Sequence, residues 1–99
     1  MPKDARTIIS DFNAHIKKRA GQPSEWYVGV TEDIDGRLFG RHAVPRKGHW
    51  YIYREAYTTQ DARAVEKAFL DSGCDGGGGG GDEDARFVYA YLKTSITDP

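Results

Sequence analysis

Three short segments rich in aromatic and β-branched residues constrain the fold of this chain more than any other feature. They are residues 25–31 (EWYVGVT), 49–58 (HWYIYREAYT) and 86–93 (RFVYAYLK). Their composition and length are typical of strands. In the third segment Phe87, Tyr89 and Tyr91 are two residues apart, so we expect the three rings on one face of a sheet.

Helical periodicity fills the stretches between these strands. Ile8, Phe12 and Ile16 recur every four residues, which predicts one apolar face of a helix over residues 4–19. Residues 32–42 and 59–70 are also expected to be helices. The two glycines within 32–42 weaken that helix by about 1 kcal/mol each relative to alanine, a cost that close approach of a backbone or ligand would explain.

Polar residues mark where the second and third helices begin. Thr31 or Asp33 is expected to cap the second helix, and Thr59 or Asp61 the third, because these side chains accept hydrogen bonds from the first free backbone N–H groups. The resulting order is helix, strand, helix, strand, helix, strand.

This order predicts a single α+β domain with a small three-stranded, mainly antiparallel sheet flanked by helices. Ninety-nine residues suffice for one such domain with one modest core. We expect an extra N-terminal helix and turn over 1–22, a core over 26–72, a glycine-rich loop over 74–84 and a last strand over 86–93.

Composition limits the cellular setting. An apolar fraction of 38% and a charged fraction of 29% are ordinary for a globular protein. No apolar run approaches the roughly 20 residues of a membrane span, and the first ten residues contain no apolar signal region. The single cysteine, Cys74, cannot form an internal disulfide. We expect a cytoplasmic protein with no membrane partner.

The six glycines of residues 76–81 admit two interpretations. A run without side chains loses the most backbone entropy on ordering, which favours a flexible loop. A phosphate cradle is the alternative, but the run matches neither the Walker A nor the dinucleotide pattern, and aspartates flank it. The flexible loop is the preferred interpretation.

Charge supports nucleic-acid binding only locally. Fourteen basic and fifteen acidic residues give a net charge of −1, so the whole molecule lacks a basic footprint. Basic residues nevertheless cluster at 17–19 and again within residues 37–47. We expect Arg41, Arg46 and Lys47 to contact substrate, although such clusters are often only solvated surface.

The string YVGVTEDIDGRLFGRH, residues 27–42, resembles the core of the GIY-YIG nuclease family. In that family a Tyr-Ile-Gly strand is followed by a helix with an arginine about ten residues on, a second strand, and a helix with glutamate in an Ala-x-x-x-Glu setting. Ala62 and Glu66 provide the last element. The family pattern is matched at Tyr27, Val28, Gly29, Thr31, Asp33, Ile34, Arg37 and Leu38.

One family element is displaced in this chain. Family members begin with a Gly-Ile-Tyr-like strand, whereas only a helix and a turn precede Tyr27. The C-terminal strand around Tyr89 is similar to the missing one, which implies a circular permutation through the glycine-rich loop. The resemblance then covers residues 26–93.

The resemblance implies a metal-dependent endonuclease that hydrolyses phosphodiester bonds in nucleic acid, with DNA the expected substrate. Glu66 would hold Mg²⁺ or Mn²⁺, and Arg37 would contact the scissile phosphate. Tyr27 would act as base or position the water, Tyr89 would assist across the phosphate, and His42 would shuttle protons.

Other roles for these residues remain open. Tyr27 and Tyr89 could be cross-strand packing partners, and Arg37 with Glu66 a surface ion pair. His42 follows Arg37 by five residues where the family more often has four, and His49 is a substitute.

The family's late asparagine has no match, since the only asparagine is Asn13 in the first helix. The alternative functions are a non-catalytic module that binds nucleic acid or protein, and an interaction protein that assembles through its first helix. A single-domain nuclease would rely on a protein partner for targeting.

Overall fold

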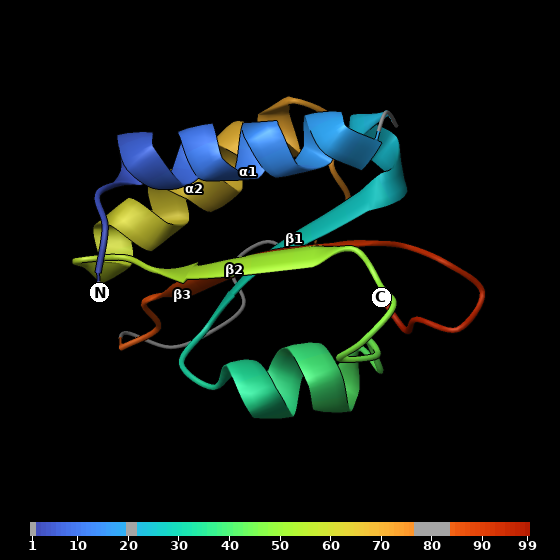
Figure 1. The fold of residues 1–99 in the computed structure, drawn as a ribbon. Coiled ribbons are helices and arrows are strands. Elements are labelled where there is room, and N and C mark those ends of the chain that lie inside the picture. Colours follow the sequence, from blue (N-terminus) through green and yellow to red (C-terminus); the bar gives the residue numbers. More distant parts are fainter. Residues whose placement is uncertain (1, 20–21, 77–83) are drawn as a thin grey trace.

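A computed structural model describes residues 2–19, 22–76 and 84–99. The described chain forms helices and strands in the expected alternation (Figure 1). The elements are α1 (Ala5–Arg19), the 3₁₀ turn η1 (Pro23–Glu25), β1 (Trp26–Thr31), η2 (Asp35–Arg41), β2 (Tyr51–Glu55), α2 (Thr59–Asp71) and β3 (Phe87–Leu92).

The three strands form one antiparallel sheet in the order β1-β3-β2. The last strand of the chain therefore lies in the middle, paired with β1 on one side and with β2 on the other. Gly29 and Tyr53 are both register partners of Tyr89, which places them on either side of that residue. The α+β class and the antiparallel sheet are as predicted.

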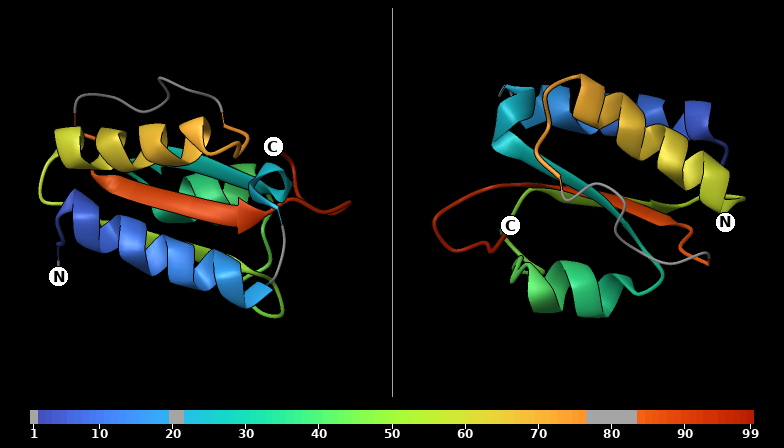
Figure 2. Two further views of the ribbon diagram at one scale, coloured as in Figure 1. Left: turned by 90° about the horizontal axis from the view of Figure 1, so that it is seen from above. Right: turned by 180° about the vertical axis from the view of Figure 1, so that it is seen from behind.

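Helices cover both faces of the sheet. Figure 2 shows α1 and α2 side by side over one face, and η2 lies against the other (Figure 1). The face under α1 and α2 carries the apolar positions of the alternating strands, including Val28, Ile52 and Val88. Ile8 and Phe12 of α1 pack into this layer with no exposed surface, as their four-residue spacing predicted.

The helix starts follow local hydrogen bonding. Asp33 accepts from the Gly36 N–H through Oδ1 (3.0 Å), as one of the two expected caps would. The expectation for α2 was wrong by one residue, since Thr58 rather than Thr59 or Asp61 is the cap and accepts from the Asp61 N–H at 3.0 Å. The strand predicted to reach Thr58 ends earlier, at Glu55, and Thr58 lies beyond it in an extended conformation.

The second helix is wound more widely than an α-helix. In η2 the His42 N–H bonds the carbonyl of Arg37, five residues back, at 2.9 Å. This is the hydrogen-bond pattern of a π-helix, a rare form found often at functional sites. Ala43 ends it with φ of +57°, a left-handed turn unusual for a residue other than glycine.

Most of the glycine run lies outside the described residues, so both interpretations of it stay predictions. Gly76 is described, and a Cβ there would overlap the Val28 carbonyl oxygen and a Leu70 methyl group. Close packing therefore requires glycine at 76. Across residues 2–19, 22–76 and 84–99, no helix is long and apolar enough to cross a bilayer.

Candidate functional site

Tyrosines crowd the sheet face that η2 covers. Two cross-strand rows run over this face, because side chains at partner positions of neighbouring strands share a face. One row is Tyr27, Tyr91 and Tyr51, and the other is Gly29, Tyr89 and Tyr53. The Tyr27 and Tyr91 rings stack with centroids 5.3 Å apart, so the cross-strand partner of Tyr27 is Tyr91 and not Tyr89, the partner considered from the sequence.

Gly29 leaves room for the Tyr89 ring. A Cβ built on Gly29 would overlap the hydroxyl oxygen and the Cζ of Tyr89. The phenol of the central strand therefore extends over the edge strand β1, into the space where any other residue would place its side chain. The position of Tyr89 therefore requires a glycine as the third residue of the Tyr-Val-Gly tripeptide.

Two of the predicted site residues hydrogen-bond to the Tyr89 hydroxyl. His42 Nε2 lies 2.8 Å from the hydroxyl oxygen, and the Arg37 guanidinium donates a hydrogen bond to it. Burial raises the pKa of Tyr89 most, the Tyr27 phenol raises this pKa further, Arg37 opposes both, and Glu66 adds to the rise. Each of the other four predicted catalytic residues thus lies near enough to hydrogen-bond to Tyr89 or to affect its charge.

His42 is held as a neutral ring with a defined hydrogen position. Its Nδ1 lies 2.7 Å from the Asp98 carbonyl oxygen, which can only accept, so Nδ1 carries the hydrogen and Nε2 accepts from Tyr89. Burial lowers the pKa of His42 most, and the charges of Arg37 and Arg41 lower it further, whereas the bond to Asp98 raises it. His42 as a whole is 2% exposed.

The π winding of η2 accounts for the unusual spacing of Arg37 and His42. In an α-helix the residue four positions on stacks above a given residue, whereas in a π-helix it is the residue five positions on. The bond from the His42 N–H to the Arg37 carbonyl shows that these two are stacked in this way. The wider winding of the helix therefore accommodates the one residue by which this spacing exceeds four, and His42 rather than His49 reaches Tyr89.

His49 lies elsewhere in the structure. Its Nε2 is 2.9 Å from the Leu92 carbonyl oxygen at the end of β3, and it is not a partner of the Tyr89 hydroxyl. His15 of α1 packs edge-on against Trp26, with ring centroids 5.8 Å apart, on the opposite sheet face. Neither histidine belongs to the candidate site.

Exposure divides the site into two layers. Tyr89, His42 and Glu66 are 1%, 2% and 5% exposed, whereas Tyr27 and Arg37 are half-buried. A phosphate can therefore touch Tyr27 and Arg37 directly. The three buried groups can act only on small species such as a proton, a water molecule or a cation.

Glu66 has the properties of a carboxylate held without full solvation. It lies in α2, and its pKa is raised by burial, with Arg63 opposing the rise. Its ion pair is with Arg63, at 3.5 Å, rather than the surface pair with Arg37 considered from the sequence. Within the described part of the chain no group of three His, Cys, Asp or Glu side chains gathers around a metal position.

One carboxylate is still compatible with Mg²⁺. This ion keeps several waters and is often held by one or two carboxylates together with substrate phosphates. The buried Glu66 oxygens fit that minimal donor set, and a cation there would also offset the unfavourable burial of the charge. Glu66 is the residue that would hold the ion.

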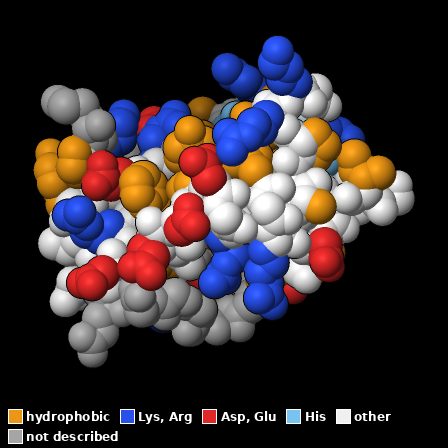
Figure 3. Space-filling view, turned by 90° about the horizontal axis from the view of Figure 1, so that it is seen from below, with side chains coloured by type: hydrophobic (Ala, Val, Ile, Leu, Met, Phe, Trp, Pro, Cys, Tyr) orange, Lys and Arg blue, Asp and Glu red, His pale blue; other side chains and the backbone are white. Residues whose placement is uncertain are grey.

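The basic residues expected to contact substrate do not form a uniform patch. Arg46 lies over the Phe39 ring, 4.1 Å from its centroid, and pairs with Asp35 at 2.9 Å. Arg41 and Lys47 are exposed. On the face seen from below, acidic side chains are interspersed among the basic ones (Figure 3). The substrate contacts expected of Arg41 and Lys47 stay a prediction, whereas Arg46 already has protein partners.

Two residues near His42 were not identified from the sequence. The Tyr91 hydroxyl lies 3.1 Å from His42 Nδ1, and Asp98 contributes its backbone. The period-two pattern of β3 placed Tyr91 on the face of Tyr89, and that pattern was the available signal. A backbone carbonyl has no signal in sequence, so Asp98 could not have been found.

Comparisons with protein-family models, with curated proteins and with solved structures returned no match for this chain.

Proposed function

We propose that this chain is a GIY-YIG-like endonuclease domain that hydrolyses phosphodiester bonds in nucleic acid with the help of a divalent cation. The observation that carries the proposal is that His42 and Arg37 both hydrogen-bond to the Tyr89 hydroxyl, while the charges of Tyr27 and Glu66 act on the same group and raise its pKa. The five residues come from β1, η2 and the turn that ends it, α2 and β3. Cross-strand packing alone would explain the tyrosines but not the arginine, histidine and glutamate beside them.

Tyr89 and His42 form a pair able to accept a proton. The Tyr89 O–H donates to the neutral Nε2 of His42, and because Arg37 donates to the phenol oxygen, one lone pair remains there to accept from a water molecule. When that water attacks phosphorus, its proton passes to the Tyr89 oxygen as the Tyr89 proton passes to His42. The bond from phosphorus to the leaving oxygen breaks, and solvent protonates that oxygen.

Arg37 would bind the scissile phosphate, and Tyr27 would orient the water that attacks it. Both are half-buried and accessible, and Arg37 can offer its remaining N–H groups while it bonds Tyr89. A guanidinium matches two phosphate oxygens with parallel charge-assisted hydrogen bonds. Tyr27 stands beside the His42 ring, with centroids 4.7 Å apart, where its hydroxyl can orient the attacking water.

Glu66 would hold the cation. When bound, Mg²⁺ or Mn²⁺ polarises phosphoryl oxygens and stabilises the charge that develops on the leaving group. The protein's part is to present a carboxylate from α2 that burial has left poorly solvated.

A non-catalytic module that binds nucleic acid is the second candidate. The burial of Tyr89, His42 and Glu66 favours it, since a phosphate cannot reach these three groups directly. Arg41 and Lys47 would then supply salt-dependent contacts to the backbone. The two candidates make different predictions for cleavage.

Nicking of supercoiled plasmid DNA in Mg²⁺ or Mn²⁺ tests the proposal. Tyr89→Phe should lower the rate by about 10²- to 10⁴-fold, the usual contribution of general acid–base catalysis. Tyr53→Phe, which removes the hydroxyl of the register partner on β2, should leave the rate unchanged. Glu66→Gln should abolish the response to added Mg²⁺.

Absence of nicking by the unaltered protein with either ion, or equal loss in the Tyr89→Phe and Tyr53→Phe variants, would contradict the nuclease assignment. DNA binding that weakens with salt, without cleavage, would establish the binding module instead.

A further inference from the structure

We infer that the turn formed by Thr94 to Thr97, together with the backbone of Asp98, is a positioning device that sets the tautomer of His42. The role of that tautomer in hydrolysis rests on the proposed function. The device itself rests on hydrogen bonds that are independent of it.

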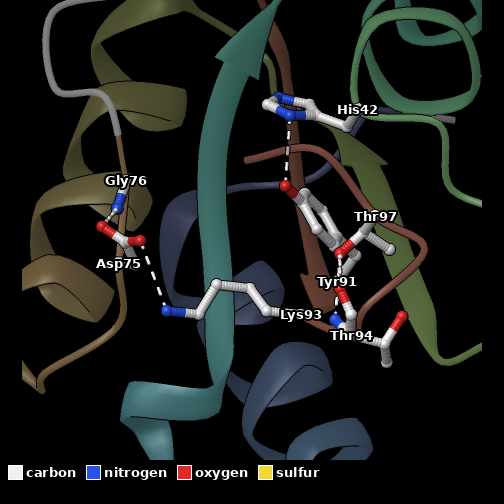
Figure 4. Close-up of polar contacts among 7 residues, drawn as sticks. All are labelled: His42, Asp75, Gly76, Tyr91, Lys93, Thr94 and Thr97. Carbon is white, nitrogen blue, oxygen red and sulfur yellow. Dashed lines mark hydrogen bonds and ion pairs between the residues drawn. The ribbon is translucent and has the colours of Figure 1, made fainter.

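The turn after β3 is closed by a reciprocal set of hydrogen bonds. Thr97 Oγ1 accepts from the Thr94 N–H at 2.9 Å and donates to the Thr94 carbonyl at 3.1 Å (Figure 4). The Thr97 N–H also bonds that carbonyl, at 3.2 Å. Thr97 is buried although the neighbouring residues of the turn are exposed. One side-chain hydroxyl at the end of the turn therefore binds both backbone groups of the residue at its start.

The turn brings Asp98 against His42 in two ways. The Asp98 N–H donates to the His42 carbonyl at 2.8 Å, and the Asp98 carbonyl faces His42 Nδ1 at 2.7 Å. Both bonds are short, and they join residues 56 positions apart in the chain. The segment is thus fastened to both the backbone and the ring of His42.

The carbonyl is the group that selects the tautomer. A neutral imidazole has one N–H, and a carbonyl oxygen can only accept. The Tyr91 hydroxyl, 3.1 Å from the same nitrogen, could donate to Nδ1 or accept from it, so Tyr91 alone would allow either tautomer (Figure 4). Asp98 removes this ambiguity and leaves Nε2 with its lone pair toward Tyr89.

The direction of the His42–Tyr89 hydrogen bond follows from this choice. With the hydrogen on Nδ1, Tyr89 must donate to Nε2, and Nε2 can take up the phenol proton. With the hydrogen on Nε2, the ring would donate to Tyr89 and could not accept its proton. Asp98 is therefore a positioning residue that acts through His42.

Nitrogen NMR of the ¹⁵N-labelled full chain at pH 7.5 tests the device, because protonated and lone-pair ring nitrogens have different shifts. We expect the unaltered protein to show His42 with hydrogen on Nδ1. Thr97→Val, which removes the hydroxyl at similar volume, should give a mixture of both tautomers. Thr97→Ser keeps the hydroxyl and should restore the Nδ1–H form, and Ser95→Ala in the same turn should not change it.

Several outcomes would overturn the device. An Nε2–H tautomer in the unaltered protein is one, and it needs no variant to fold. A second is a folded Thr97→Val protein in which the His42 tautomer is unchanged. A third is a Thr97→Ser protein that loses the Nδ1–H form as completely as Thr97→Val does. A tautomer shift without any change in nicking would support the device and count against the role of His42 in the proposed hydrolysis.

Discussion

Gly29 illustrates how a single residue shapes the site. It faces Tyr89 across the β1–β3 pair, and the absence of a side chain at 29 gives the Tyr89 phenol the space in which its hydroxyl meets His42. The sequence explains this glycine only as part of a tripeptide. The structure gives it a steric reason, which makes it a good position for substitution.

Replacement of Gly29 by alanine should displace the Tyr89 ring. The added methyl group overlaps Tyr89 atoms in a closely packed layer, and overpacking of this kind costs about 1–3 kcal/mol. Urea unfolding should show that loss, and the His42 ring shifts should change with it. Gly40→Ala is the matched control, because its Cβ would meet only the Asp35 carbonyl at 3.5 Å, and helical alanine gains about 0.5–1 kcal/mol over glycine. Equal stability of the two variants would contradict the steric account.

At the scale of an element, the winding of η2 decides which histidine joins the site. The π pattern stacks His42 on Arg37 despite the five-residue spacing, so the helix accommodates one more residue than an α-helical turn would. Local periodicity predicted a helix here but could not predict its pitch. Tertiary contacts of the His42 ring with Tyr89 and Asp98 accompany the wider winding.

Deletion of Gly40 should therefore be tolerated. It shortens the Arg37-to-His42 spacing to four, which an α-helical turn stacks in the same way. We expect the hydrogen bond between His42 and Tyr89 to persist, detected by the ring nitrogen shifts. Deletion of Ala64 from α2 is the contrasting change, since it turns buried residues such as Val65 and Phe69 by about 100° and should cost several kcal/mol, about 2–5 per misplaced side chain. Unfolding of the Gly40 deletion as severe as that of the Ala64 deletion would rule out the compensation.

At the scale of the whole molecule, buried ionisable groups on both sheet faces couple folding to pH. Burial lowers the pKa of His15 and of His42, so the unfolded chain binds these protons more readily than the folded protein. Their contribution to stability is present above the ordinary value of 6.5 and is lost as the pH falls through the lowered folded values. Glu66 acts in the opposite sense, because its raised pKa lets the folded protein take up a proton first.

We expect the free energy of unfolding to decrease between pH 7.5 and pH 5.5. His15→Leu should make the decrease smaller, since it removes one of the two groups responsible. Glu66→Gln should lower the stability further as the pH falls toward 4.5, because the opposing proton uptake by the folded protein is gone. Urea titrations at several pH values measure the pH dependence of the free energy of unfolding for the unaltered protein, His15→Leu and Glu66→Gln. The same dependence in all three proteins would refute its assignment to these ionisable groups.

The sequence by itself determined the local structure and most members of the candidate site. Alternation in β3 placed Tyr89 and Tyr91 on one face, and four-residue spacing identified the buried side of α1. These patterns are readable because a strand repeats every two residues and a helix about every 3.6, so the apolar face is encoded in neighbouring residues. The error at the start of α2 arose because Thr58, Thr59 and Asp61 can each cap a helix, and only the backbone geometry distinguishes them.

The tertiary structure alone decided how these parts meet. The central position of β3 and the placement of the Asp98 carbonyl against His42 depend on backbone groups far apart in sequence, and backbone hydrogen bonding is the same for nearly every residue. The pitch of η2 and the burial of Tyr89, His42 and Glu66 likewise follow from packing between elements. The sequence therefore identified the residue types. The fold decided which of them are buried and which accessible, and it set the direction of the hydrogen bond between His42 and Tyr89.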